Sequence, residues 1–144
     1  MVKINRNLLV PLLFYLFAFI LDSSITTYGI SNNLGSEGDK IVLWLWGIFG
    51  KDGLLLKAIY VALVFTISWI IYRKFSKFIG LFIPYSLAIG HILGFSTWIF
   101  FLNNYFGLII LYKFHVLLGN IGIFIIAPLI GFVLSFIHSK RIKQ

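Results

Sequence analysis

The chain has 144 residues, of which 60% are hydrophobic and only 11% are charged, and it contains no cysteine. Soluble domains carry about 25% charged residues, so this composition indicates an integral membrane protein. The absence of cysteine excludes disulfides, thiolate metal sites and thiol nucleophiles. The net charge of +8 does not indicate nucleic-acid binding, because the basic residues cluster at the ends of apolar stretches instead of forming a continuous stripe.

The first predicted transmembrane helix covers residues 8–28, close to the roughly 20 residues needed to cross a bilayer. Lys3 and Arg6 precede it, as basic residues also precede the apolar part of a signal peptide. The apolar stretch is long, however, and no clear cleavage site with small residues follows Asp22. We therefore expect this helix to be retained as the first membrane span.

A polar connection follows over residues 31–53, and its Gly, Ser, Asn and Asp content is typical of a loop. Within it, residues 41–50 are apolar but too few to span the membrane. Trp44 and Trp46 favour a segment that lies in the membrane interface or re-enters the bilayer.

Three more membrane spans are predicted, over residues 53–72, 78–102 and 115–137. A short basic turn over residues 73–77 joins the second span to the third. The outer connection before the fourth span contains the apolar stretch 107–112, which we expect to rest on the membrane. The predicted fold is a single all-α domain, residues 1–144, in the form of a four-helix membrane bundle with interfacial segments in its outer loops.

The charges predict the orientation of this bundle. Cytoplasmic loops of membrane proteins carry an excess of Lys and Arg. With both termini in the cytoplasm of a prokaryotic cell, eight of the twelve basic residues lie inside and all acidic residues lie outside or in the outer leaflet. The inner set is Lys3, Arg6, Arg73, Lys74, Lys77, Lys140, Arg141 and Lys143, and the acidic set is Asp22, Glu37, Asp39 and Asp52.

Small residues recur every four positions in the third and fourth spans. Such stripes let helix backbones approach closely in lipid, so we expect these two spans to pack as a tight hairpin, although the stripes could also contact another subunit. Pro84 and Pro128 are expected to kink their helices. The stripes consist of Ser86, Gly90 and Gly94 in the third span and of Ala127, Gly131 and Ser135 in the fourth.

Polar side chains inside the spans predict a pocket that opens outward. At 1.5 Å per residue, Asp22, Lys57 and His91 fall at similar heights in the outer half of the bilayer. Ionised side chains at this depth need a partner or a function. One hypothesis is a site for an ion, a small solute or a lipid headgroup; the other is a structural Asp22–Lys57 ion pair beside a neutral His91. The candidate pocket residues are Asp22, Thr26, Lys57 and His91, with Glu37 and His115 at the rim.

No cofactor and no metal site are predicted. Haem ligation by His91 and His115 is disfavoured, because the two residues differ by roughly 10–15 Å in predicted depth. No local spacing typical of metal ligands is present, and no motif of a hydrolase or phosphate-binding enzyme occurs.

The pattern Asp22-x-x-x-Thr26, Gly35-x-Glu37, Lys57 and Asn103-Asn104 resembles a family of small four-span prokaryotic membrane proteins of unknown function. The resemblance covers about residues 15–110. The family's usual Asn-Pro after the loop glutamate is replaced here by Gly38-Asp39. The resemblance implies a four-span fold and selects the same polar residues as the depth argument.

These features lead to a first hypothesis, in which the protein is a non-catalytic accessory or assembly subunit of a larger membrane complex. Small size, packing stripes and the lack of a catalytic motif favour it. An outward-facing binding or transport protein that acts as a homo-oligomer is the alternative, and a membrane-embedded enzyme or cofactor carrier is a third. The expected partners are membrane lipids and either other subunits or copies of the same chain.

Overall fold

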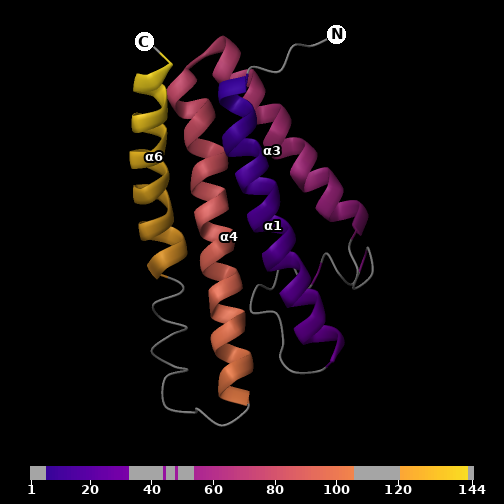
Figure 1. Cartoon of the computed structure of the whole chain (residues 1–144). Helices are drawn as coiled ribbons and strands as arrows, with labels where there is room; N and C mark the ends of the chain where they lie inside the picture. The colour runs from indigo at the N-terminus through magenta and orange to yellow at the C-terminus, as the bar shows by residue number, and fades with distance from the viewer. Residues whose placement is uncertain (1–5, 33–43, 45–47, 49–53, 106–120, 143–144) are drawn as a thin grey trace.

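A computed structural model describes residues 6–32, 44, 48, 54–105 and 121–142 (Figure 1). In these ranges the chain is helical apart from the turns, and no strand occurs. The elements are α1 (Arg6–Ser31), α3 (Leu54–Lys74), α4 (Lys77–Tyr105), the short π-helix η2 (Gly122–Ile126) and α6 (Ala127–Arg141).

Four helical stretches are long and apolar enough to cross a membrane: 6–31, 56–74, 77–99 and 124–141. The predicted all-α fold with four membrane-spanning helices is therefore confirmed. Helices α1 and α4 extend one to three residues beyond the predicted spans at both ends, whereas α3 begins one residue after the predicted start and ends two residues beyond the predicted end. Several predicted features lie outside the described residues, apart from Trp44 and Ile48. They are the start of the fourth span, the interfacial segments 41–50 and 107–112, and the outer loops.

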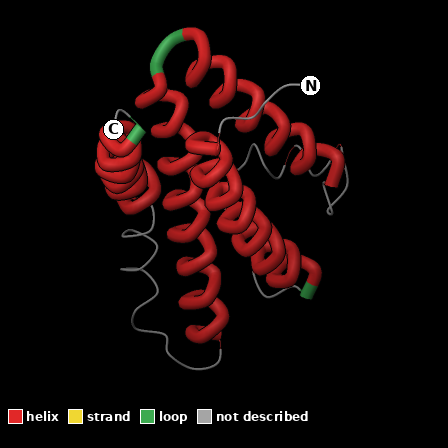
Figure 2. Tube along the Cα trace, turned by 45° about the horizontal axis from the view of Figure 1, so that its top comes forward, coloured by secondary structure: helices red, strands yellow, loops and turns green. Residues whose placement is uncertain are grey.

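Helix α4 is the centre of the bundle and packs against α1, α3 and α6 (Figure 1). Both α1 and α4 begin at the same end and run in parallel, whereas α3 and α6 run in the opposite direction. A tight turn joins α3 to α4. With increasing distance from this turn, α3 leans away from α1, and these two helices share few contacts (Figure 2). Most lipid-facing positions are large apolar side chains, as expected for a bundle whose solvent is hydrocarbon.

Two buried clusters hold the helices together. The first lies at the end where α1 begins and where α3 turns into α4, and it consists of Leu8, Leu12, Tyr72 and Leu81 with Ile142 packed against it. The second lies deeper between α1, α3 and α4 and consists of Tyr15, Ala18, Val64 and Ala88. The start of α1, the α3–α4 turn and the end of α6 therefore meet at one end of the molecule.

The small-residue stripes divide between two neighbours instead of forming one face. Gly131 of α6 lies against Ser86 of α4, so closely that a Cβ atom at Gly131 would be 2.8 Å from the Ser86 Cα. Gly94, by contrast, faces Asp22 of α1. Around a Cβ placed at Gly90, no described atom outside its own helix lies within 4 Å. A four-residue spacing drifts around the helix axis, which carries the three positions toward different neighbours.

Pro128 is preceded by a π-helical turn. Proline lacks an N–H group, and its ring clashes with the carbonyl four residues earlier, so a regular α-helix cannot continue through it undisturbed. The wider turn of η2 over Gly122–Ile126 comes immediately before Ala127 and Pro128. The irregularity expected at Pro128 is therefore a π-helical segment on its N-terminal side.

Candidate functional site

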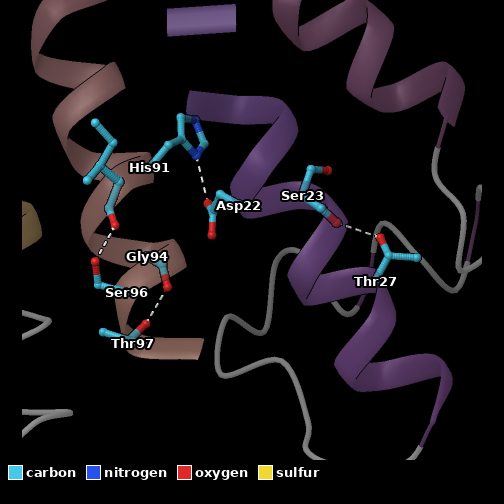
Figure 3. Close-up of polar contacts among 8 residues, drawn as sticks. Asp22, Ser23, Thr27, His91, Gly94, Ser96 and Thr97 are labelled. Carbon is cyan, nitrogen blue, oxygen red and sulfur yellow. Dashed lines mark hydrogen bonds and ion pairs between the residues drawn. The ribbon is translucent and has the colours of Figure 1, made fainter. Parts of the chain in front are cut away.

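A carboxylate and an imidazole meet between α1 and α4 in the apolar part of the bundle (Figure 3). The His91 Nδ1 atom lies 2.8 Å from the Asp22 Oδ2 atom, and the two side chains are 20% and 21% exposed. With Asp22 ionised, Nδ1–H donates to the carboxylate. The pair is thus partly accessible, and its two members can share or release one proton between them.

Gly94 provides the space that the Asp22 carboxylate occupies. A Cβ atom at this position would lie 2.9 Å from Oδ1 and 3.1 Å from Oδ2 of Asp22. Any larger residue at position 94 would therefore displace the carboxylate from His91. The pair depends on three residues: one on α1 and two, one turn apart, on α4.

Three aromatic rings surround His91 on the sides facing α1 and α3. Phe19 is nearest, with ring centroids 5.1 Å apart in an edge-to-face arrangement, followed by Tyr15 at 5.8 Å and Tyr60 at 6.4 Å. This aromatic shell covers His91 on the sides that face α1 and α3.

The hydroxyl group of Tyr15 is buried beside this pair without a hydrogen bond to any described residue. The Tyr60 hydroxyl is a polar neighbour that interacts with it only outside the geometry of a regular hydrogen bond. Buried hydroxyl groups normally find a partner, because leaving one unpaired costs free energy. An unpaired hydroxyl beside an Asp–His pair is a donor available to a ligand.

A second polar contact lies about one and a half turns further along α1. The Lys57 Nζ atom of α3 donates to the Thr27 Oγ1 atom at 2.9 Å. That hydroxyl in turn donates to the Ser23 carbonyl at 2.8 Å (Figure 3). This contact places a cation above the Asp22–His91 pair and joins the splayed end of α3 to α1.

The structure therefore brings together part of the predicted pocket. Asp22 and His91 meet, and Lys57 reaches the same side of α1 through Thr27 rather than through the predicted Thr26. Thr26 is half-buried on the neighbouring face. Glu37 and His115 lie outside the described residues.

Sequence reasoning did not include Tyr15, Phe19 and Tyr60. A signal was present for two of them, because Tyr15, Phe19 and Asp22 follow the i, i+4, i+7 spacing that places side chains on one helix face. Tyr60 lies on another helix, and its distance from His91 depends on how α3 packs.

A second histidine forms a contact nearer the basic end. The Tyr85 hydroxyl of α4 and the His138 Nδ1 atom of α6 lie 2.9 Å apart. Other hydroxyl groups bond within their own helices, as Ser96 does to the Ile92 carbonyl and Thr97 to the Gly94 carbonyl (Figure 3). Such local bonds satisfy a polar side chain without creating a site.

In the described part of the chain, no three His, Asp or Glu side chains lie close enough to hold a metal ion. His91 and Asp22 supply two ligands at most. Haem ligation through His91 stays a hypothesis without a second described ligand.

No protein-family model, no curated protein and no solved structure matches this chain. The resemblance to small four-span prokaryotic membrane proteins therefore stays a prediction. What the chain does has to be inferred from the membrane-embedded Asp22–His91 pair and its surroundings.

Proposed function

We propose that this small membrane protein binds and transports an ion or a small polar solute through a site centred on Asp22 and His91. The observation that carries the proposal is the 2.8 Å contact of these two ionisable groups inside an apolar bundle. An ionised Asp at the centre of a membrane helix costs at least about 2.5–3.5 kcal/mol, and ionisable residues within membrane spans characteristically mark ion and proton pathways. A purely structural contact would not need partial exposure or an unpaired Tyr15 hydroxyl beside it.

The chemistry of the site favours a proton, or a solute bound together with a proton. The pair can hold or release one proton, and the Tyr15 hydroxyl can donate to a bound oxygen. On the proposed orientation, with both termini cytoplasmic, the site lies in the outer half of the membrane. A homo-oligomer would complete the pathway, because four helices alone leave little room for one.

Proton flux into proteoliposomes tests this proposal. A potassium gradient with valinomycin supplies the driving potential, and a trapped pH-sensitive dye reports the flux. We expect flux above that of protein-free liposomes and a decrease of about tenfold or more in Asp22→Asn, because an amide cannot accept the proton. The matched control is Ser96→Ala on α4, whose hydroxyl bonds only within its helix and whose loss should leave the flux unchanged. Equal flux in wild type and Asp22→Asn would contradict the proposal.

A second candidate function is an accessory subunit of a larger membrane complex, and Gly90 favours it. A glycine with open space beside it on a membrane helix is suited to close approach by a helix of another chain. Purification in mild detergent followed by mass measurement of the intact particle separates the two candidates. A different protein at fixed stoichiometry, lost on Gly90→Leu, would support the subunit role, whereas a homo-oligomer favours the transport site.

A further inference from the structure

Six basic side chains are exposed at one end of the bundle. They belong to three segments that are far apart in the sequence: the start of α1, the α3–α4 turn with its flanking residues, and the end of α6. We call this set the basic collar. Its members are Arg6, Arg73, Lys74, Lys77, Lys140 and Arg141.

The buried cluster beneath the collar explains why the three segments converge. Leu8, Tyr72 and Leu81 are buried against one another, and Ile142 packs onto them. Arg6 precedes Leu8 by two residues, Arg73 directly follows Tyr72, and Arg141 directly precedes Ile142. Each basic segment is thus anchored to the same core, which concentrates the charge at one place.

No acidic side chain in the described ranges compensates this charge. The acidic residue that these ranges contain, Asp22, lies sixteen residues along α1 from Arg6, about 24 Å at 1.5 Å per residue, and is paired with His91. The collar therefore presents concentrated positive charge to whatever surrounds that end of the bundle.

Aromatic side chains hold the collar at the edge of the apolar surface. Phe75, in the turn between Lys74 and Lys77, is 78% exposed. The Arg73 guanidinium lies 5.7 Å from the centre of the Trp69 ring, and the Lys140 ammonium lies 4.4 Å from that of Phe136. Basic groups on apolar stems, beside an exposed ring, lie where lipid chains meet headgroups.

We infer that the basic collar binds the headgroups of anionic phospholipids, with the turn over residues 73–77 as the principal contact. Lysine and arginine supply the charge for a headgroup phosphate, and Phe75 enters the adjacent acyl region. A soluble polyanion would match the charge but would leave Phe75 exposed to water. The inference is independent of the Asp22–His91 site, which lies in the middle of α4 and beyond the middle of α1, away from the collar.

Native mass spectrometry of the full chain in neutral detergent tests this inference. Phosphatidylglycerol and phosphatidylcholine with identical acyl chains are added at equal concentration, and the affinity of the first bound lipid is measured for each. We expect phosphatidylglycerol to bind about tenfold or more tightly. Each basic residue near an anionic surface contributes about fivefold, so R73Q/K74Q/K77Q should weaken phosphatidylglycerol binding by at least about tenfold while phosphatidylcholine binding stays the same.

Two matched variants distinguish local charge from net charge. The charge-conserving R73K/K74R/K77R should retain the preference, and so should K40Q/K51Q/K113Q, which removes the same charge from segments expected on the opposite side. If R73Q/K74Q/K77Q fails to fold, K140Q/R141Q at the end of α6 carries the test and should lose about tenfold or more. Equal binding of both lipids by the wild type would overturn the inference. So would an equal loss in K40Q/K51Q/K113Q.

Discussion

At the scale of single residues, Asp22 and His91 show what the sequence can and cannot specify. Their equal depth was predictable, because helix rise is fixed and both spans begin at a basic cluster. The rotation of each helix about its axis was not predictable, since it depends on packing. Lys57 therefore meets Thr27 instead of Thr26, and Gly94 faces Asp22 instead of α6.

The Tyr15 hydroxyl allows a test that separates function from packing. Tyr15→Phe removes a buried, unpaired hydroxyl and keeps the ring, so the free energy of unfolding should stay the same or rise by about 1 kcal/mol. If the hydroxyl binds the transported species, the proton flux should fall by about tenfold. Thermal unfolding in detergent and the proteoliposome assay measure the two effects. A destabilised protein with normal flux would assign Tyr15 a structural role only.

At the scale of elements, helix limits followed from hydropathy and charge, because the hydrocarbon thickness and the basic turn fix where a span can begin and end. Which helices touch was less predictable. The third and fourth spans pack together at Ser86 and Gly131, yet α4 also packs extensively against α1. Small residues favour close approach of two helices, but they do not determine which helix will be the neighbour.

The same substitution, glycine to alanine, should affect the stability of the protein differently at two positions of this packing. Gly131→Ala introduces a Cβ atom 2.8 Å from a backbone atom of α4, and we expect a loss of about 1–3 kcal/mol in stability. Gly90→Ala meets open space, so helix propensity alone should leave stability unchanged or raise it by up to about 1 kcal/mol.

Unfolding in mixed micelles of mild detergent and dodecyl sulfate measures both variants under the same conditions. Gly131→Ala without loss of stability would contradict the close approach of α4 and α6, and destabilisation by Gly90→Ala would contradict the open space beside Gly90.

At the scale of the whole molecule, the structure places the start of α1, the α3–α4 turn and the end of α6 at one end (Figure 1). The chain contains no cysteine, so an introduced cysteine is a unique label. We expect a membrane-impermeant maleimide to label Ser76→Cys and Ser139→Cys from the cytoplasmic side and Ser31→Cys from the opposite side.

Labelling of intact cells and of inverted membrane vesicles, compared for the three variants, determines the topology. Labelling of Ser76→Cys and Ser31→Cys from the same side would contradict a membrane-spanning α1, and labelling of all sites in reverse would contradict the proposed cytoplasmic location of the termini.

The central position of α4 has a consequence for how the chain is made. Asp22 and His91 are 69 positions apart, and α1 and α3 share few contacts, so the ribosome delivers two helices to the membrane before the helix that joins them exists. During that interval the Asp22 carboxyl lacks its imidazole partner, and α1 is retained in the bilayer by its own hydrophobicity and its basic start. The arrival of α4 forms the Asp22–His91 pair and joins α1 to α3 in the same step, and α6 completes the bundle only afterwards, which makes assembly of this protein a late event in its synthesis.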